Sequence, residues 1–318
     1  PAFPTRLFAF SKNQRFFANQ FVRMYYVVYA LAYLFSLLPL RALYGLSDFL
    51  RIFLYYIVPY RKKLVFSNLA IAFPEKTQAE REKIARDFYR NFIDHFLETL
   101  KLLSVNKKFL RKHFTIDNPE LFEQFFREGR RCQLHLGHSF NWEWANNALP
   151  LISGYPFIVI YMPISNKIFN RLVLHIRTRT GAIQVPATDA RKQMLAYRKL
   201  PYMLTLVADQ APGSPANAYW LNFFGKPAPF VRSPERGARA GNTPALFVHF
   251  YKPARGFYHV KLFPGSDNPA ALPEGELTRR YIRFLEWSIR EEPSLYLWTH
   301  RRWKYGWKEE YEGLTVDG

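Results

Sequence analysis

The residue types that could do chemistry gather in one stretch, Cys132–Glu143, which reads Cys-Gln-Leu-His-Leu-Gly-His-Ser-Phe-Asn-Trp-Glu. The pattern predicts a buried strand, a tight turn at Gly137 and then the start of a helix. His138 and Glu143 follow the strand and are separated by four residues. A histidine that accepts a proton, beside a carboxylate that orients its ring, can activate a hydroxyl group. We therefore interpret His138 as a general base and Glu143 as its partner, although such a spacing also arises by chance.

Polar residues also follow two further apolar runs. Tyr161 ends one run, and Asp209 and Gln210 follow the run over 204–208. Open α/β sheets place their sites at the carboxyl ends of the strands, so we expect these side chains near His138. Asp209 either shapes the site through hydrogen bonds or caps the turn that follows it, and both interpretations stay open.

Two arginines, Arg177 and Arg179, lie at the end of a predicted helix over 168–178. Basic side chains at a helix C-terminus are favourable because of the helix dipole alone. They also suit the binding of a phosphate or of a developing oxyanion. The sequence does not decide between these roles.

Other kinds of site find no support. The single cysteine, Cys132, excludes an internal disulfide and a cysteine-based zinc site, and it lies in an apolar run where it is expected to pack. His135 and His138 have no third ligand in register, so we predict no metal site. No phosphate-binding loop, no dinucleotide glycine fingerprint and no nucleic-acid motif occurs. We therefore expect no cofactor and no nucleic-acid partner.

Short apolar runs alternate with amphipathic segments after about residue 60. This order predicts an α/β fold, with a mostly parallel or mixed central sheet and helices on both faces. On the longest predicted helix, the pattern puts Phe96 on the apolar face and Asp94 on the opposite side. The predicted strands are 132–136, 157–161, 204–208, 245–251 and 258–263, and we expect the last two to be neighbours. The predicted helices are 63–73, 76–105, 118–128, 142–149, 168–178, 190–199 and 277–290.

The N-terminal part is basic and aromatic. An uncharged run covers 24–40 and a second apolar helix is predicted over 46–60. These features predict membrane-associated helices in residues 1–60, either spanning or lying in the interface, ahead of a catalytic domain over 61–318. A buried core helix is the alternative. Arg61, Lys62 and Lys63 favour the cytoplasmic side of the membrane.

The net charge of +20 implies an anionic partner. Anionic lipid, a phosphorylated sugar, an acidic protein and nucleic acid all meet that requirement. A basic membrane-binding or nucleic-acid-binding protein without catalysis is therefore a second hypothesis. The absence of a nucleic-acid motif argues against the nucleic-acid-binding form of this hypothesis.

Several motifs occur in a fixed order along the chain. Besides His138-Ser-Phe-Asn-Trp-Glu143, they are Asn68-Leu-Ala-Ile-Ala-Phe-Pro-Glu75, Tyr161-Met-Pro163, Arg177-Thr-Arg179, Ala208-Asp-Gln210 and Tyr296-Leu-Trp-Thr-His-Arg-Arg-Trp-Lys304. In this ordered set, the chain resembles the late acyltransferases of lipid A biosynthesis, the lauroyl and myristoyl transferase family. The resemblance covers nearly the whole chain.

The resemblance implies an O-acyltransferase that moves a fatty acyl chain from acyl carrier protein or coenzyme A to a hydroxyl of a lipid A precursor or similar glycolipid. The acyl thioester is a co-substrate, so no cofactor is implied. The implied location is the inner membrane, with the catalytic domain on its cytoplasmic face. Other acceptors remain open: phosphoinositol mannosides, lysophospholipids, glycerol phosphate and amino-acid lipids. The implied roles are catalysis for His138 and Glu143, and oxyanion or substrate binding for Arg177, Arg179, Asp209, Gln210, Tyr161 and Asn68.

Overall fold

A computed structural model describes residues 12–315, and within them seven strands form one sheet. The sheet order is β1-β9-β8-β2-β5-β3-β4, and every pair except the antiparallel β8–β9 is parallel. The predicted α/β class, the mostly parallel sheet and the β8–β9 neighbourhood are confirmed. The strands are β1 (Phe114–Ile116), β2 (Cys132–Leu136), β3 (Phe157–Tyr161), β4 (Ile183–Pro186), β5 (Met203–Val207), β8 (Ala245–Ala254) and β9 (Phe257–Ser266).

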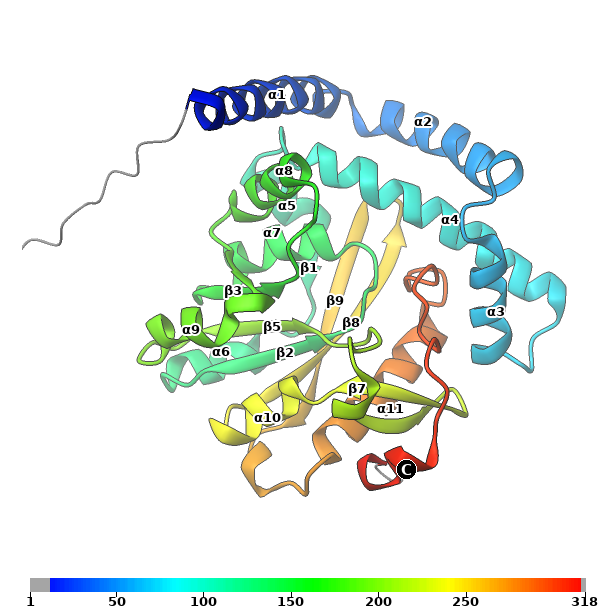
Figure 1. Cartoon of the computed structure of the whole chain (residues 1–318), viewed down its shortest axis with the longest axis vertical. Helices are drawn as coiled ribbons and strands as arrows, with labels where there is room; N and C mark the ends of the chain where they lie inside the picture. Colours follow the sequence, from blue (N-terminus) through cyan, green and yellow to red (C-terminus); the bar gives the residue numbers. More distant parts are fainter. Residues whose placement is uncertain (1–11, 316–318) are drawn as a thin grey trace, which may run out of the picture.

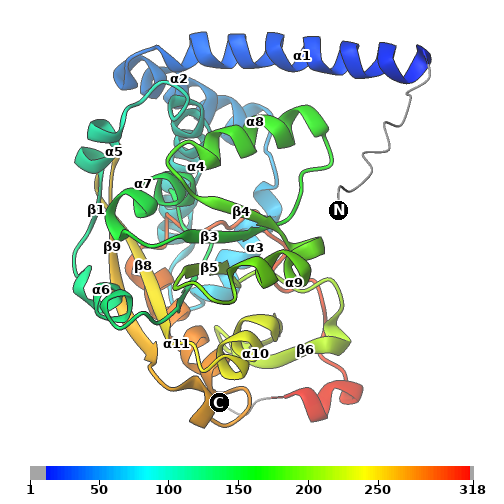
Figure 2. The same cartoon turned by 90° about the vertical axis from the view of Figure 1, so that its left-hand side faces the viewer.

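Helices cover both faces of this sheet. Figures 1 and 2 show α7 and α8 on one face, and α10 and α11 on the other. A separate antiparallel hairpin, β6 (Ala218–Phe223) with β7 (Lys226–Val231), lies near α10 and α11. The helices after the N-terminal segment are α3 (Lys62–Ala72), α4 (Gln78–Lys101), α5 (Lys107–His113), α6 (Glu120–Arg127), α7 (Trp142–Ser153), α8 (Lys167–Thr178), α9 (Ala190–Gln193), α10 (Ser233–Ala240) and α11 (Glu276–Glu291), with short 3₁₀ turns between some of them.

Strand β2 lies at the centre and is buried at every position. It pairs with β5 so that Leu136 lies beside Val207. Because the two strands run parallel, the residues two positions further on, His138 and Asp209, leave the sheet at the same edge. The pairing of strands far apart in the sequence therefore assembles the site.

Helix α4 carries buried polar residues that the sequence pattern placed wrongly. Asp94 is fully buried, and it bonds Ser47 at 2.6 Å and Arg255 at 2.7 Å. Phe96, predicted to face the core, is 53% exposed. The reason is that the N-terminal helices pack along α4 and bury its second face, which the periodicity of α4 alone does not reveal.

The N-terminal segment forms α1 (Lys12–Ser36), α2 (Leu40–Ile52) and a π-helical turn η1 (Phe53–Ile57). The first helix ends before Pro39, which directly precedes α2, so the predicted helix start near residue 46 is wrong. Among the described residues, no one helix has both the length and the hydropathy to cross a membrane. The pair Gln20–Ser36 and Leu40–Ile57, bent by 106°, meets those criteria only when its two helices are taken together.

The predicted boundary between residues 60 and 61 falls in the turn between η1 and α3. The first 11 residues of the predicted N-terminal segment, and the last three of the predicted catalytic domain, lie outside the described residues. The division into two functional parts stays a prediction.

Candidate active site

The residue after β2, Gly137, packs against a side chain of helix α11. A Cβ atom on Gly137 would lie 2.6 Å from Cδ1 of Leu285 and 3.9 Å from the carboxyl carbon of Asp209. Any larger residue at position 137 would therefore require Leu285 to move. Gly137 therefore lets the chain bring the next residue, His138, directly against Asp209.

His138 and Asp209 form a close polar contact at this edge of the sheet. Nδ1 of His138 lies 2.6 Å from Oδ1 of Asp209, and the backbone N–H of His138 donates to Oδ2 at 3.1 Å. Asp209 is 1% exposed, whereas the His138 side chain is 21% exposed. Burial works to raise the pKa of Asp209, but the adjacent His138 ring and the hydrogen bonds from His138 hold it below its usual value.

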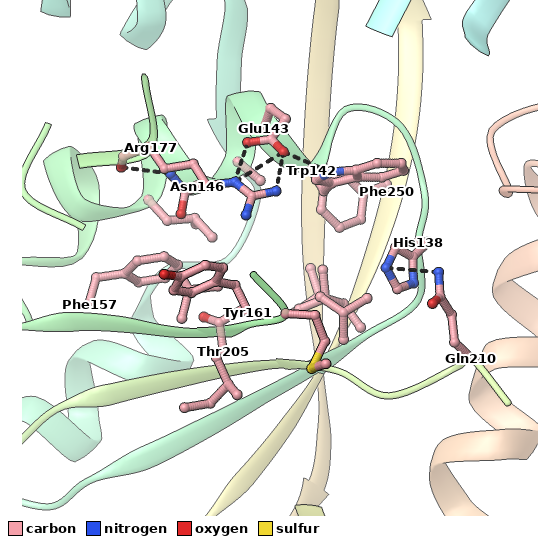
Figure 3. A pocket seen from close by; sticks show the side chains of 18 residues that line it. His138, Trp142, Glu143, Asn146, Phe157, Tyr161, Arg177, Thr205, Gln210 and Phe250 are labelled. Atoms are coloured by element: carbon pink, nitrogen blue, oxygen red, sulfur yellow. Dashed lines mark hydrogen bonds and ion pairs between the residues drawn. The ribbon is translucent and has the colours of Figure 1, made fainter. Parts of the chain in front are cut away.

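This geometry fixes the form of the imidazole ring. An ionised carboxylate only accepts hydrogen bonds, so Nδ1 of neutral His138 carries the proton and Nε2 presents a lone pair. The side-chain amide of Gln210 donates to that lone pair at 3.2 Å (Figure 3). Nε2 is therefore oriented to accept a proton from a hydroxyl group that displaces the amide.

The structure does not bring Glu143 to the His138 ring, which is the contact that their spacing predicted. Its carboxylate faces Arg177, with Nε 2.9 Å from Oε2 and Nη2 2.5 Å from Oε1, and the indole of Trp142 donates to it at 3.1 Å (Figure 3). Burial acts to raise the pKa of Glu143, but the Arg177 charge and hydrogen bonds hold it below its usual value. The structure thus corrects the predicted contact: Asp209, not Glu143, orients the His138 ring.

Glu143 faces Arg177, and not His138, because of the place where helix α7 begins. Asn141 is its N-cap, and Oδ1 of Asn141 accepts from the N–H groups of Glu143 and Trp144 at 3.1 Å each. Its amide donates to buried Glu98 at 2.8 Å, and Tyr258 donates to the same Glu98 oxygen at 2.7 Å. Glu143 is consequently held in the first turn of α7, which packs against α8.

Sequence reasoning missed this support. An asparagine before an amphipathic helix is a recognisable N-cap signal for Asn141. Its partner Glu98 lies on α4, 43 positions away, and no local pattern links the two. The burial of Glu98 could be inferred only after the helices were packed.

A cavity of about 300 Å³ runs from His138 between α7 and the sheet. Figure 3 shows His138 and Gln210 at one end and Phe157 and Thr205 at the other. Glu143 and Arg177 border it along one side. Most of its remaining lining is apolar, contributed by Leu136, Ala145, Leu149, Phe157, Val159, Val207, Val248 and Phe250. The cavity therefore joins a proton acceptor to an apolar space.

The predicted site residues divide into two groups. His138, Glu143, Tyr161, Arg177 and Gln210 line the cavity, and Asp209 holds His138 from outside it. Two predicted residues do not reach the cavity, namely Arg179, which donates to the carbonyl of Val105 at 3.4 Å, and Asn68, which donates to the carbonyls of Trp298 and His300 at 2.8 and 2.9 Å. Asn68 thus anchors the C-terminal segment to α3.

The C-terminal segment over 295–303 in turn holds the turn that carries His138. Leu297 donates its backbone N–H to the carbonyl of His138 at 3.0 Å, and Phe140 donates to the carbonyl of Leu295 at 3.0 Å. These bonds explain how a distant sequence motif can affect the site. The motif was recognised as a family landmark, but its contact with His138 was not predicted.

In the described part of the chain, no group of three or more histidine, cysteine or acidic side chains is arranged to hold a metal ion. The chemistry that the arrangement supports is proton transfer by His138 Nε2 at the end of an apolar cavity. A guanidinium group at the same cavity offers hydrogen bonds to a developing negative charge.

The family model described as bacterial lipid A biosynthesis acyltransferase matches residues 12–305. This range includes every motif on which the family resemblance was based, so the resemblance is confirmed. No curated protein matches the chain.

Proposed function

Because the chain belongs to the bacterial lipid A biosynthesis acyltransferase family, we propose that it transfers a fatty acyl group from an acyl thioester to a hydroxyl of a lipid A precursor or a similar glycolipid. The observation that carries the proposal is the position of His138. Its Nε2 lies at the end of an apolar cavity, and Asp209 holds the ring from the other side.

In the proposed reaction, His138 acts on the acceptor hydroxyl. Nε2 takes the hydroxyl proton while the oxygen attacks the carbonyl carbon of the thioester. The tetrahedral intermediate collapses, the carbon–sulfur bond breaks, and the leaving thiolate recovers the proton from His138. Asp209 stabilises the imidazolium that forms between these steps, and a positioned base of this kind contributes about 10²- to 10⁴-fold in rate. No covalent enzyme intermediate is required.

Arg177 is the proposed donor to the oxyanion. Its guanidinium group borders the cavity, and Glu143 fixes its orientation through two of its nitrogens. A preorganised donor contributes about 3 kcal/mol to the stabilisation of an oxyanion. Arg179 is not proposed for this role because it does not line the cavity. In this account Glu143 is a positioning residue for Arg177 rather than for His138.

The apolar lining suits the acyl chain. Its side chains come from α7 and from strands β2, β3, β5 and β8, so the space is enclosed by the core of the fold. Thr205 interrupts the apolar lining, and among the described residues its hydroxyl has no hydrogen-bond partner. We therefore assign the acyl chain of the donor, and not the polar acceptor, to this cavity.

We propose that α1, α2 and η1 bind the cytoplasmic face of the inner membrane. Large apolar side chains along these helices point to solvent, including Leu31, Leu34, Phe49, Tyr56 and Ile57. An apolar face of this extent on a basic protein favours an anionic lipid surface. Acyl carrier protein, acyl-coenzyme A and a phosphorylated acceptor are all anionic, as the net charge of +20 favours.

The experiment that tests this function is acyl transfer by the detergent-solubilised protein. The donors are acyl carrier protein and coenzyme A thioesters, and the acceptors are a lipid A precursor, a phosphoinositol mannoside, a lysophospholipid and glycerol phosphate. The variant is His138→Gln, and the matched control is His259→Gln. His259 lies 3.5 Å from Asp117 and outside the cavity, so it reproduces a histidine–aspartate pair at a different place.

We expect transfer to the lipid A precursor, a loss of about 10²- to 10⁴-fold in His138→Gln, and wild-type activity in the control. Transfer to another acceptor alone would keep the chemistry and replace the acceptor. Binding to vesicles with no turnover on any acceptor would favour a non-catalytic membrane-binding protein. A fully active His138→Gln would contradict the mechanism.

A further inference from the structure

A second cavity lies between helices α1 and α8, beside the cavity that His138 lines. It has a volume of about 570 Å³ and is more open to solvent than the His138 cavity. Figures 1 and 2 both show α8 next to α1, and the two helices are in contact. The lining includes Tyr25 from α1, Arg171 and His175 from α8, and Tyr161 and Gln184 from β3 and β4.

Two residues connect the second cavity with the His138 cavity. Tyr161 lines both of them. Gln184 lines the second cavity and donates from its amide to Oδ1 of Asn146 at 2.8 Å, and Asn146 lines the His138 cavity. A substrate whose reacting group lies near His138 therefore has a neighbouring place for another of its groups.

The second cavity carries positive charge that its own lining does not balance. Neither α1 nor α8 contains an acidic residue, and no carboxylate belongs to the described residues that line the cavity. Arg171 and His175 lie one turn apart on α8, and Arg179 follows at the end of that helix. Burial and the charges of Arg179 and Arg171 lower the pKa of His175. The cavity therefore attracts an anion.

Aromatic rings of α1 hold both basic side chains. The guanidinium carbon of Arg171 lies 4.1 Å from the ring centre of Tyr25. The ring of His175 meets that of Tyr29 edge to face, with 5.2 Å between the ring centres. A guanidinium group that packs on an aromatic ring keeps the hydrogen-bond donors at its edge, and their planar arrangement matches two oxygens of a phosphate group. Arg171 is therefore positioned to bind a phosphate.

Gln184 adds a hydrogen-bond acceptor to these donors. Its Oε1 is buried, and among residues 12–315 no group donates a hydrogen bond to it. An unpaired buried acceptor is unfavourable, and a hydroxyl or N–H group of a ligand would satisfy it. The second cavity thus suits a phosphate ester that carries a hydroxyl or amide group nearby. A phosphorylated sugar has these groups, and so does a phosphopantetheine arm.

We propose that the second cavity binds a phosphate group of a substrate, with Arg171 as its main contact, while the reacting end of that substrate lies at His138. The proposal deepens the acyl transfer proposed above and rests on it for the identity of the substrates. Two substrates supply such a phosphate, namely the glycolipid acceptor and the phosphopantetheine thioester of the donor. The position of the cavity beside α1, a proposed membrane-binding helix, favours the acceptor.

The test combines Arg171→Gln with removal of the phosphate from each substrate in turn. The acceptors are the lipid A precursor and its phosphatase-treated form. The donors are acyl-phosphopantetheine and acyl-pantetheine, which differ only in the phosphate. For one substrate, we expect loss of the phosphate to lower kcat/KM about tenfold or more in the wild type but little in Arg171→Gln, because the contact is already absent. That substrate is the source of the phosphate.

The matched control is Arg236→Gln. It removes an equal charge from an exposed position on α10, across the sheet from α8. The control should keep the full dependence on the phosphate, and Arg171→Lys should keep part of it. Arg171 is itself exposed, so thermal unfolding of Arg171→Gln should match that of the wild type. Losses that multiply for both substrates would overturn the proposal.

A binding measurement separates this proposal from the proposed function. Native mass spectrometry of the detergent-solubilised protein compares the affinities for the same four compounds and for phosphatidylglycerol. We expect Arg171→Gln to bind one phosphorylated substrate about tenfold or more weakly and to bind its phosphate-free form as the wild type does. An equal loss of affinity for phosphatidylglycerol would indicate a site for membrane lipid and would overturn the proposal.

The two measurements together distinguish the possible failures. If the wild type transfers no acyl group but Arg171→Gln loses phosphate-dependent binding, the proposed function fails and the phosphate site stands. If acyl transfer occurs and Arg171→Gln binds every phosphorylated compound as tightly as the wild type, the phosphate site fails and the proposed function stands.

Discussion

The Glu143 carboxylate is almost fully buried, and the basic side chain that bonds it is Arg177. Its pKa lies below the ordinary value of 4.5 because Arg177 outweighs the effect of burial. A carboxylate with a lowered folded-state pKa stabilises the fold above its unfolded-state pKa, and this stabilisation is lost as the pH falls through the lower value. The Glu143–Arg177 pair therefore makes stability depend on pH below about 4.5.

We predict that Glu143→Gln lowers the free energy of unfolding by about 3 kcal/mol at neutral pH, because Arg177 is left with a neutral partner. The difference from wild type should shrink as the pH falls below about 4.5, where the wild-type carboxylate itself takes up a proton. Denaturant unfolding at neutral pH and at a pH below about 4.5 measures this difference in the free energy of unfolding. The control is Glu75→Gln, which breaks an exposed pair with Arg290 and should have little effect. A pH-independent difference would refute the assignment.

Thr205 lines the cavity on the side away from His138, as Phe157 does (Figure 3). We predict that Thr205→Leu fills part of the space and lowers kcat/KM for the longest accepted acyl donor at least about tenfold relative to a shorter one. Thr205→Val, close to threonine in shape, should retain the wild-type preference and lose only an unpartnered hydroxyl. Competition between acyl thioesters of different length measures the preference. An unchanged preference in Thr205→Leu would mean that the acyl chain lies elsewhere.

At the scale of elements, the turn after β2 depends on how closely it approaches α11. We predict that Gly137→Ala destabilises the fold by about 1–3 kcal/mol and reduces activity, because the added Cβ would overlap Leu285. Adding Leu285→Ala should restore part of both losses. Gly213→Ala is the matched control, since nothing lies within 4 Å of the Cβ position there. Thermal unfolding and acyl transfer measure the effects, and equal behaviour of the two alanine variants would disprove the close approach.

Much of the architecture was predictable from the sequence, because β2 and β3 are short apolar runs with polar residues directly after them. The bounds of both strands were predicted correctly. The hairpin β6–β7 and the short strands β1 and β4 were missed. Strands β1 and β4 have only three and four residues, and two prolines in β7 disfavour a strand. The apolar run that begins β6 was present in the sequence but was not interpreted as a strand.

The site was predictable in part for a related reason. Tyr161, Asp209 and Gln210 were expected near His138 because all follow strands, and the sheet brings them there. The partner of His138 could not be settled, because it depends on the β2–β5 register, which joins residues 71 positions apart. The local spacing of His138 and Glu143 favoured the wrong partner.

At the scale of the whole molecule, the exposed apolar side chains of the N-terminal helices are the feature behind the membrane binding proposed above. Helices α1 and α2 lie along one end of the molecule, and the last 3₁₀ turn, Glu309–Leu314, lies at the other (Figure 1). The α2–η1 part exposes Phe49 at 65% and Ile57 at 66%. Exposed apolar area of this kind costs free energy in water, and its burial in a lipid interface recovers that free energy.

We predict that Phe49→Asp combined with Ile57→Asp weakens binding to anionic phospholipid vesicles at least about tenfold, because each change removes apolar area and adds a negative charge. Vesicle co-sedimentation measures the affinity. The control is Trp307→Asp, which changes an exposed aromatic residue outside the N-terminal helices. Its binding should match the wild type. Equal weakening in both proteins would indicate attraction by net charge without a defined face.

The most direct measurement of the central claim is single-turnover acyl transfer by wild type, Asp209→Asn, His138→Gln and their double variant, with Asp117→Asn as the control. The Asp209→Asn variant has no carboxylate charge to keep the proton on Nδ1 of His138, so the base loses its orientation. The account predicts losses of about 10²-fold or more in each single variant, a double variant no worse than His138→Gln, and an unaffected control. A fully active Asp209→Asn, or losses that multiply in the double variant, would contradict it.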